Sequence, residues 1–183
     1  MHLEGGRVTL REFRSDDVAE LERFHKDPRY LEFYAPEVSE PTFAKTLVGL
    51  FIRTAKEEPR YDYTLAIVER VSSQLIGCCS LRTAGQQAGY AEFGMEVSPD
   101  FWGRGLAAAA AREMIRFGFD ALRLDEIRGV SVTANHRVEP LVTKLGFVKI
   151  AEHGGAPWMT ARGWTHTVWA LTKATWAQRE CLC

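Results

Sequence analysis

The sequence has few of the features that mark secreted, membrane-bound or nucleic-acid-binding proteins. It contains only four cysteines, in the pairs Cys78-Cys79 and Cys181-Cys183, and this spacing fits neither a disulfide framework nor a zinc site. The sequence contains no run of about 18 apolar residues, the length that could span a membrane. The chain also does not open with a basic segment followed by an apolar core. Lys and Arg number 23 against 24 for Asp and Glu, so no basic excess attracts nucleic acid. We therefore expect a reduced, cytoplasmic protein with no nucleic-acid partner, membrane partner or metal.

The composition that remains is that of a soluble globular domain. Of the 183 residues, 46% are hydrophobic and 26% are charged, and the formal net charge is −1. No internal repeat, low-complexity tract or long linker divides the chain. We expect one domain that covers residues 1–183.

Hydrophobic periodicity predicts alternating strands and helices. Strands are expected at 8–11, 63–69, 75–82, 90–97, 127–133, 147–152 and 165–171, the first of them at a sheet edge. Helices are expected at 15–25, 41–56, 105–119 and 138–145 and around Trp176, with Ser15 as the first N-cap and Gly146 ending the fourth helix. Three successive strands indicate an antiparallel meander, and the strand after the third helix indicates a βαβ unit. The pattern predicts an α/β fold with a mixed sheet, an antiparallel N-terminal half joined to a βαβ-like C-terminal half.

The most informative stretch covers residues 92–107, where a strand breaks at Ser98-Pro99 and a glycine-bearing turn enters an alanine-rich helix. Gly103 and Gly105 allow peptide N–H groups to converge on an anion at the helix N-terminus, and Arg104 adds positive charge. The stretch is neither a P-loop nor a dinucleotide fingerprint, because the residues that follow the glycines differ. It predicts a diphosphate-binding turn, with a purely structural connection as the alternative.

This stretch resembles the signature of the GNAT superfamily of acyl-CoA-dependent N-acyltransferases, Arg/Gln-x-x-Gly-x-Gly/Ala, at residues 102–107. Trp102 departs from the first position, but the RimJ/RimL-like (ribosomal-protein-alanine acetyltransferase) branch commonly has an aromatic-Trp-Gly-basic-Gly sequence there, as residues 101–105 do. The similarity extends to Val8–Arg11 with Asp16-Asp17, to Asn135 with Lys144–Phe147, and to Trp169–Leu171 with Trp176. Nearly the whole chain is covered, and a chance match of four ordered segments is far rarer than a match of one.

The resemblance implies the GNAT fold and acetyl-CoA as the acyl donor. It implies that the diphosphate lies on the glycine turn, and that peptide groups beside the pantetheine arm polarise the thioester carbonyl. It assigns cofactor contacts to Met95, Val97, Trp102, Gly103, Arg104, Gly105, Leu106, Ala107 and Asn135. For Asn135 a capping turn before the helix at 138 is the alternative. Val138 and Val142 stand where relatives often carry a Ser and a proton-donating Tyr, and neither can donate a proton.

Acetyl transfer needs a neutral amine, whereas a lysine-like amine with a pKa of about 10.4 is protonated at neutral pH. Glu92 and Glu96 have the same parity on their predicted strand, so both can point to one face of the sheet. Glu92 matches the Glu of the branch's Ala-Glu-x-Gly pattern and is the first candidate for the catalytic base, with Glu96 the second. For each, a solvated or ion-paired strand residue is the alternative. His136 and His166 are further candidates without an identifiable partner.

The sequence thus predicts an N-acetyltransferase in which a primary amine attacks acetyl-CoA directly in a ternary complex. The predicted acceptor is an amine-bearing small molecule or a protein N-terminus, received by the aromatic segments 30–36 and 154–164. The enzyme is expected to be a monomer or homodimer. The alternative is a catalytically weak acyl-CoA-binding regulatory module, which Val138 and Val142 favour and which Glu92, Asn135 and the turn glycines oppose.

Overall fold

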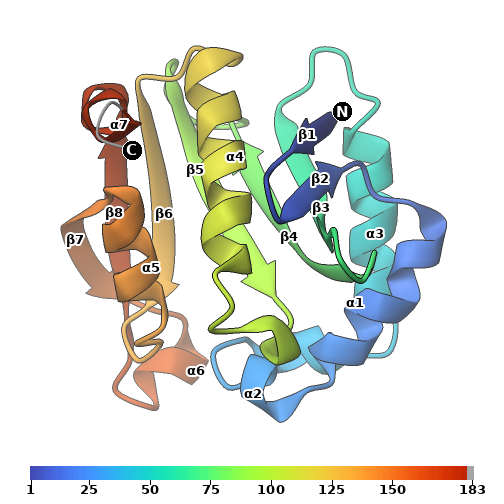
Figure 1. Cartoon of the computed structure of the whole chain (residues 1–183). Helices are drawn as coiled ribbons and strands as arrows, with labels where there is room; N and C mark the ends of the chain where they lie inside the picture. Colours follow the sequence, from blue (N-terminus) through green and yellow to red (C-terminus); the bar gives the residue numbers. More distant parts are fainter. Residues whose placement is uncertain (181–183) are drawn as a thin grey trace.

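The computed structural model describes residues 1–180, and its centre is an eight-stranded sheet (Figure 1). The strands are β1 (His2–Glu4), β2 (Val8–Arg11), β3 (Asp62–Glu69), β4 (Leu75–Arg82), β5 (Tyr90–Val97), β6 (Glu126–Val132), β7 (Val148–Gly154) and β8 (Thr165–Thr172). Their order in the sheet is β1-β2-β3-β4-β5-β6-β8-β7, and every neighbouring pair is antiparallel except β5 with β6. The predicted mixed sheet is confirmed. Cys181 and Cys183 lie outside the described residues.

Helices cover both faces of the sheet. They are α1 (Val18–His25), α2 (Pro28–Leu31), α3 (Phe43–Thr54), α4 (Leu106–Asp120), α5 (Val138–Leu145), α6 (Pro157–Thr160) and α7 (Lys173–Glu180). Short 3-10 helices lie at Ser15–Asp17, Pro36–Ser39 and Pro99–Phe101. We call the side covered by α1 and α3 the α3 face, and the side covered by α4 and α5 the α4 face.

Each face has its own apolar cluster, because the side chains of successive strand residues alternate between the two faces. On the α3 face, Phe24 of α1 and Val48 of α3 pack against Ala66 of β3. On the α4 face, Met114 of α4 packs with Leu65 of β3 and with the buried side chains of α5. The sheet is thus packed between two helical layers. The loops at the strand ends are not covered by these layers and can form a binding site.

Two local expectations are corrected, and two short helices are added. Ser15 does not cap the first helix: a 3-10 turn precedes α1, and the Asp17 carboxylate accepts a hydrogen bond from the Arg14 N–H at 2.7 Å. The strand at 8–11 is not at the edge, because β1 pairs outside it. The four-residue helices α2 and α6 were not expected, since such short segments carry no periodic signal.

The parallel strands β5 and β6 pair over only part of their length. The pairing runs from Tyr90 with Glu126 to Phe93 with Gly129, and no pairing follows in residues 1–180. Beyond this point the carboxyl ends of β5 and β6 diverge, as Figure 1 shows below the centre of the sheet. The divergence leaves an opening in the sheet between the carboxyl ends of β5 and β6.

On its other side β5 is held very close to β4 at Gly77. A Cβ at Gly77 would clash with the carbonyl oxygen of Glu96 and lie 2.9 Å from the Cα of Val97. Because the obstacle is backbone rather than a flexible side chain, any side chain at Gly77 must displace β5 where it borders the opening.

We predict that Gly77→Ala lowers the free energy of unfolding by about 1–3 kcal/mol through overpacking and also weakens ligand binding at the opening. Gly49→Ala is the control, because that glycine lies in α3 with no atom within 4 Å of the place a Cβ would take, and alanine favours the helix. Urea unfolding of the two variants measures the change in stability. A Gly77→Ala protein as stable as the Gly49→Ala protein would contradict the close approach of the two strands.

Candidate active site

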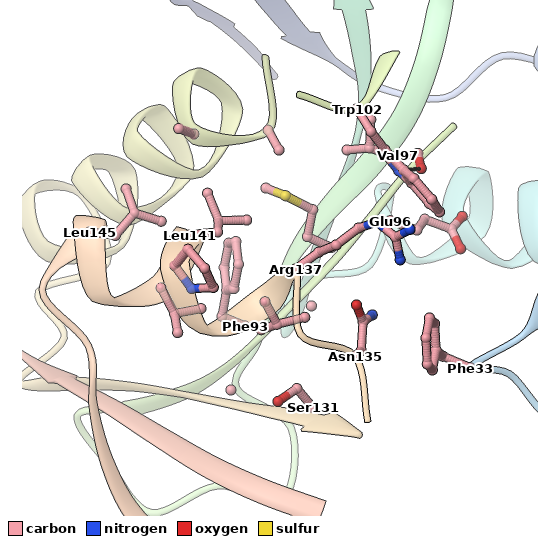
Figure 2. Close-up of a pocket in the computed structure, with 18 of the residues that line it drawn as sticks. Phe33, Phe93, Glu96, Val97, Trp102, Ser131, Asn135, Arg137, Leu141 and Leu145 are labelled. Atoms are coloured by element: carbon pink, nitrogen blue, oxygen red, sulfur yellow. Dashed lines mark hydrogen bonds between the residues drawn. The ribbon is translucent and has the colours of Figure 1, made fainter. Parts of the chain in front are cut away.

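A cavity of about 730 Å³ occupies the opening between β5 and β6 (Figure 2). Leu141 and Leu145 of α5 line it from the α4 face. Tyr30 and Phe33 line it from the opposite side, together with Glu96, whose side chain lies on the α3 face. Since residues from both faces line one cavity, the cavity passes through the sheet.

The glycine turn forms one wall. Gly103 and Gly105 have φ values of 71° and 75°, a left-handed conformation that glycine adopts without strain, and Gly105 is the N-cap of the 15-residue α4. No heavy atom lies within 4 Å of the place a Cβ would take on Gly103, so the turn is open at this point. Free N–H groups and the helix dipole at the start of α4 make this wall suitable for an anion.

The backbone of β5 supplies polar groups to the cavity. Ser98 donates its N–H to the carbonyl of Ile76 at 2.7 Å, and in an antiparallel pair alternate residues bond to the partner strand. Met95 and Val97, three and one residues earlier, therefore direct their N–H and C=O groups away from β4 and into the opening. The indole Nε1–H of Trp102 donates to the Val97 carbonyl at 2.7 Å. The N–H groups of Met95 and Val97 stay available to a ligand.

Asn135 lies on the opposite wall, after β6. Its buried Oδ1 has no hydrogen-bond partner among the described residues, and its side chain does not cap α5, whose N-cap is Arg137. The capping alternative is therefore not observed. A buried, unpaired acceptor costs free energy unless a ligand donor reaches it, so this oxygen fits a ligand with N–H groups.

The other residues expected at the cofactor divide into two groups. Trp102, Gly103, Gly105 and Ala107 line the cavity with Met95, Val97 and Asn135. Arg104 does not line it: its guanidinium pairs with the Glu69 carboxylate and lies 5.1 Å from the Phe101 ring centroid. The side chain of Leu106 is also turned away, because it is 1% exposed within the core of the α4 face. The contacts expected from these two residues stay predictions.

Arg137 is a cavity residue that the sequence did not single out. Its guanidinium lies 4.5 Å from the ring centroid of Trp102, and Figure 2 shows the side chain reaching from the start of α5 across the cavity. A cation at a helix N-terminus is unfavourable because it opposes the helix dipole. This unfavourable position was the feature of the sequence that could have identified Arg137. No carboxylate pairs with Arg137 in residues 1–180.

Glu96 is the acidic side chain of the cavity, and three groups donate hydrogen bonds to it. His25 Nε2 lies 3.2 Å from Oε1, Cys78 Sγ lies 3.4 Å from Oε1, and the Tyr30 hydroxyl donates to Oε2. Burial alone would raise the pKa of Glu96, but the hydrogen bonds from His25, Tyr30 and Cys78 hold that pKa below its ordinary value. The carboxylate is therefore fixed in its ionised form.

Glu92 points to the same face but does not line the cavity. It forms an ion pair with Arg82 at 2.6 Å, and 42% of the side-chain surface of each partner is exposed. Arg82 also donates to the Ser80 hydroxyl at 3.0 Å. His136 and His166 are likewise absent from the cavity lining in the described part of the chain. The role of Glu92 as catalytic base stays a prediction.

The two aromatic segments expected at the acceptor lie against each other. The ring centroids of Phe33 and Trp164 are 5.7 Å apart, and Arg162 donates to the Glu32 carbonyl at 3.1 Å. Arg29 of α2 reaches Asp100, just before the glycine turn, at 2.7 Å. These contacts join the acceptor segments to each other and to the turn.

Residues 1–180 hold neither a membrane-spanning helix nor a metal-binding cluster. None of the helices there combines the length and apolar character that a membrane crossing requires. No group of three or more His, Cys, Asp or Glu side chains in that range is arranged to hold a metal ion.

Comparison with known proteins identifies relatives of this chain. Residues 7–148 match the family model described as the acetyltransferase (GNAT) domain. The uncharacterized N-acetyltransferase YoaA of Bacillus subtilis is 27% identical over 148 residues, which cover 80% of this chain and 82% of YoaA.

Two solved structures show the same fold. The ribosomal-protein-S5-alanine acetyltransferase of Vibrio fischeri has a TM-score of 0.78 at 15% identity, covering 96% of this chain and 98% of that one. The spermidine N-acetyltransferase of Vibrio cholerae, solved with CoA and spermine, also has a TM-score of 0.78, at 17% identity, covering 93% of this chain and 98% of that one.

The lowered pKa of Glu96 predicts an acid-sensitive fold. A carboxyl group whose pKa is lower in the folded than in the unfolded protein adds stability above its unfolded pKa, and this stability is lost as the pH falls through the folded pKa. The stability advantage of the wild type over Glu96→Gln should therefore shrink as the pH is lowered from about 7 to about 4. Thermal unfolding of both proteins across this range measures it. A difference that does not change with pH would show that the pKa of Glu96 is the same in the folded and the unfolded protein.

Proposed function

The chain belongs to the GNAT acetyltransferase family, and we propose that it transfers the acetyl group of acetyl-CoA to a primary amine by direct attack in a ternary complex. The observation that carries the proposal is the cavity through the sheet, beside the unpaired N–H groups of Met95 and Val97. Such a cavity lets two substrates meet from opposite faces without a covalent enzyme intermediate. The absence of Cys78 and Cys79 from the cavity lining in residues 1–180 supports direct attack.

Acetyl-CoA, the cosubstrate of the family, supplies an acetyl thioester and a diphosphate. We assign the diphosphate to the turn of Gly103 and Gly105, where the α4 N–H groups attract anions. The N–H groups of Met95 and Val97 are suited to the pantetheine arm and to the negative charge that develops on the thioester oxygen. The unpaired Oδ1 of Asn135 is suited to an amide N–H of the same arm.

The acceptor reaches the thioester from the α3 face. Its nitrogen forms the new C–N bond as the C–S bond breaks, and the proton lost from the amine passes to a base. Glu92 is the first candidate for this base and Glu96 the second. The CoA sulfur leaves as a thiolate, and because a thiol pKa is about 8.5 it needs little help from an acid. This agrees with Val142, which cannot donate a proton.

We further propose a cytoplasmic enzyme that acts as a monomer or homodimer on a small-molecule amine or a protein N-terminus. Two proteins with a similar fold are named as acetyltransferases of a ribosomal protein and of spermidine, and these names support this range of acceptors. Release of free CoA thiol from acetyl-CoA, measured across peptides, polyamines and other amines, tests the proposed function. Binding of acetyl-CoA without release for any amine would instead support the regulatory module.

We predict that Gly105→Val abolishes acetyl-CoA binding, measured by calorimetry. Its side chain would stand where the diphosphate approaches the backbone, at a φ that valine rarely adopts. Gly85→Val is the matched control, because Gly85 has a similar left-handed φ of 71° and open surroundings but lies in the β4–β5 turn, away from the cavity. Comparable losses of affinity in both variants would assign the effect to backbone strain.

We predict that Glu92→Gln lowers the rate of the chemical step by about 10²- to 10⁴-fold if Glu92 is the base, with little change in acetyl-CoA affinity. The defect should shrink as the pH rises, because more of the amine is then neutral. Single-turnover rates as a function of pH measure this. Wild-type turnover at neutral pH would show that the proton leaves by another route.

A further inference from the structure

Glu96 is the sole acidic residue among the described residues that line the cavity, which also include the basic residues Arg29, Arg137 and Lys144. Arg29 is paired with Asp27 and Asp100, so its charge is largely balanced. The cavity thus offers one negative group to a substrate and no second one within residues 1–180. An acceptor with several positive charges would meet one carboxylate and unpaired cations.

The carboxylate of Glu96 has room for one more donor. An ionised carboxylate has about four acceptor positions, and His25, Tyr30 and Cys78 occupy three of them. The side chain keeps 12% of its surface exposed and borders the cavity. The geometry leaves a position for a single N–H of an ammonium group.

Apolar side chains surround this position. The ring of Tyr30 stacks between the rings of His25 and Tyr34, with centroid distances of 5.0 Å and 4.2 Å. This stacking holds the aromatic surface beside Glu96 in place. Phe33 and Val130 extend the apolar surface outward. Val130 is 49% exposed, and it faces the same side as Glu96, because β6 pairs Arg128 with Glu92 and side chains alternate along a strand.

We propose that the acceptor is a primary amine with one positive charge on an apolar body. Glu96 binds the ammonium group, and Phe33, Tyr34 and Val130 contact the body. This inference rests on the acetyl transfer proposed above. It distinguishes Glu96, which anchors the acceptor, from the group that removes its proton.

Two sources of this chemistry exist, an arylalkylamine and a polypeptide whose first residue is apolar. The experiment therefore compares 2-phenylethylamine and a short peptide that begins with phenylalanine, with ethylamine as the acceptor that has no apolar body and spermidine as the polycation. The rate of CoA release gives kcat and KM for each acceptor. We expect 2-phenylethylamine or the peptide to exceed both ethylamine and spermidine in kcat/KM.

Glu96→Gln should raise the KM of the preferred acceptor by about 10- to 100-fold, because a hydrogen bond between charged groups is lost, while kcat and acetyl-CoA affinity change little. Glu126→Gln is the matched control: Glu126 lies on the same face of the sheet, is paired with Arg128 and does not line the cavity. A loss of kcat without a change in KM would make Glu96 the base and overturn the anchoring role.

Phe33→Ala tests the apolar contact separately and does not disturb the buried hydrogen bonds of Glu96. It should reduce kcat/KM for the aromatic acceptor toward the value for ethylamine and leave the ethylamine value unchanged. A preference for spermidine, or equal effects of Phe33→Ala on both amines, overturns the acceptor class alone. If acetyl-CoA binds and no amine releases CoA, acetyl transfer itself is overturned, and the acceptor class with it.

Discussion

The parting of β5 and β6 is the constraint on which the site depends. A strand that loses its neighbour leaves N–H and C=O groups unpaired inside the protein, and such groups need partners. Trp102 satisfies the Val97 carbonyl. The remaining groups face the cavity, where a chain-like substrate with amides of its own can bond to them as a further strand would. The proposed location of the cofactor therefore follows from where the sheet stops pairing.

Glu96 joins this opening to the helices of the α3 face. His25 of α1 and Tyr30 of α2 donate hydrogen bonds to its carboxylate, so both helices are attached to the strand that borders the cavity. Removing one partner of a buried charged group costs more than the bond itself, because the other partner stays unpaired. The atoms proposed to bind the acceptor are thus the same atoms that attach α1 and α2 to β5.

Much of the fold could be predicted locally. The ranges of β4, β5 and α5 agree with their strand and helix patterns, since turns or a glycine end each of them. The glycine turn was predictable for the same reason, because Gly103 and Gly105 lie within one short segment. Contacts between distant segments were not: Glu96 meets His25 across 71 positions, and Arg104 meets Glu69 across 35. No spacing rule in the sequence connects these partners.

The cavity that passes through the sheet also bears on the order of events. In the proposed mechanism the two substrates use opposite faces, so a bound cofactor does not block the path of the amine, and a bound amine does not trap the cofactor. Steric hindrance therefore does not fix the order in which the two substrates bind or leave. A bisubstrate analogue would have to pass through the opening in the sheet. The part that connects its two halves could be no wider than the gap between β5 and β6.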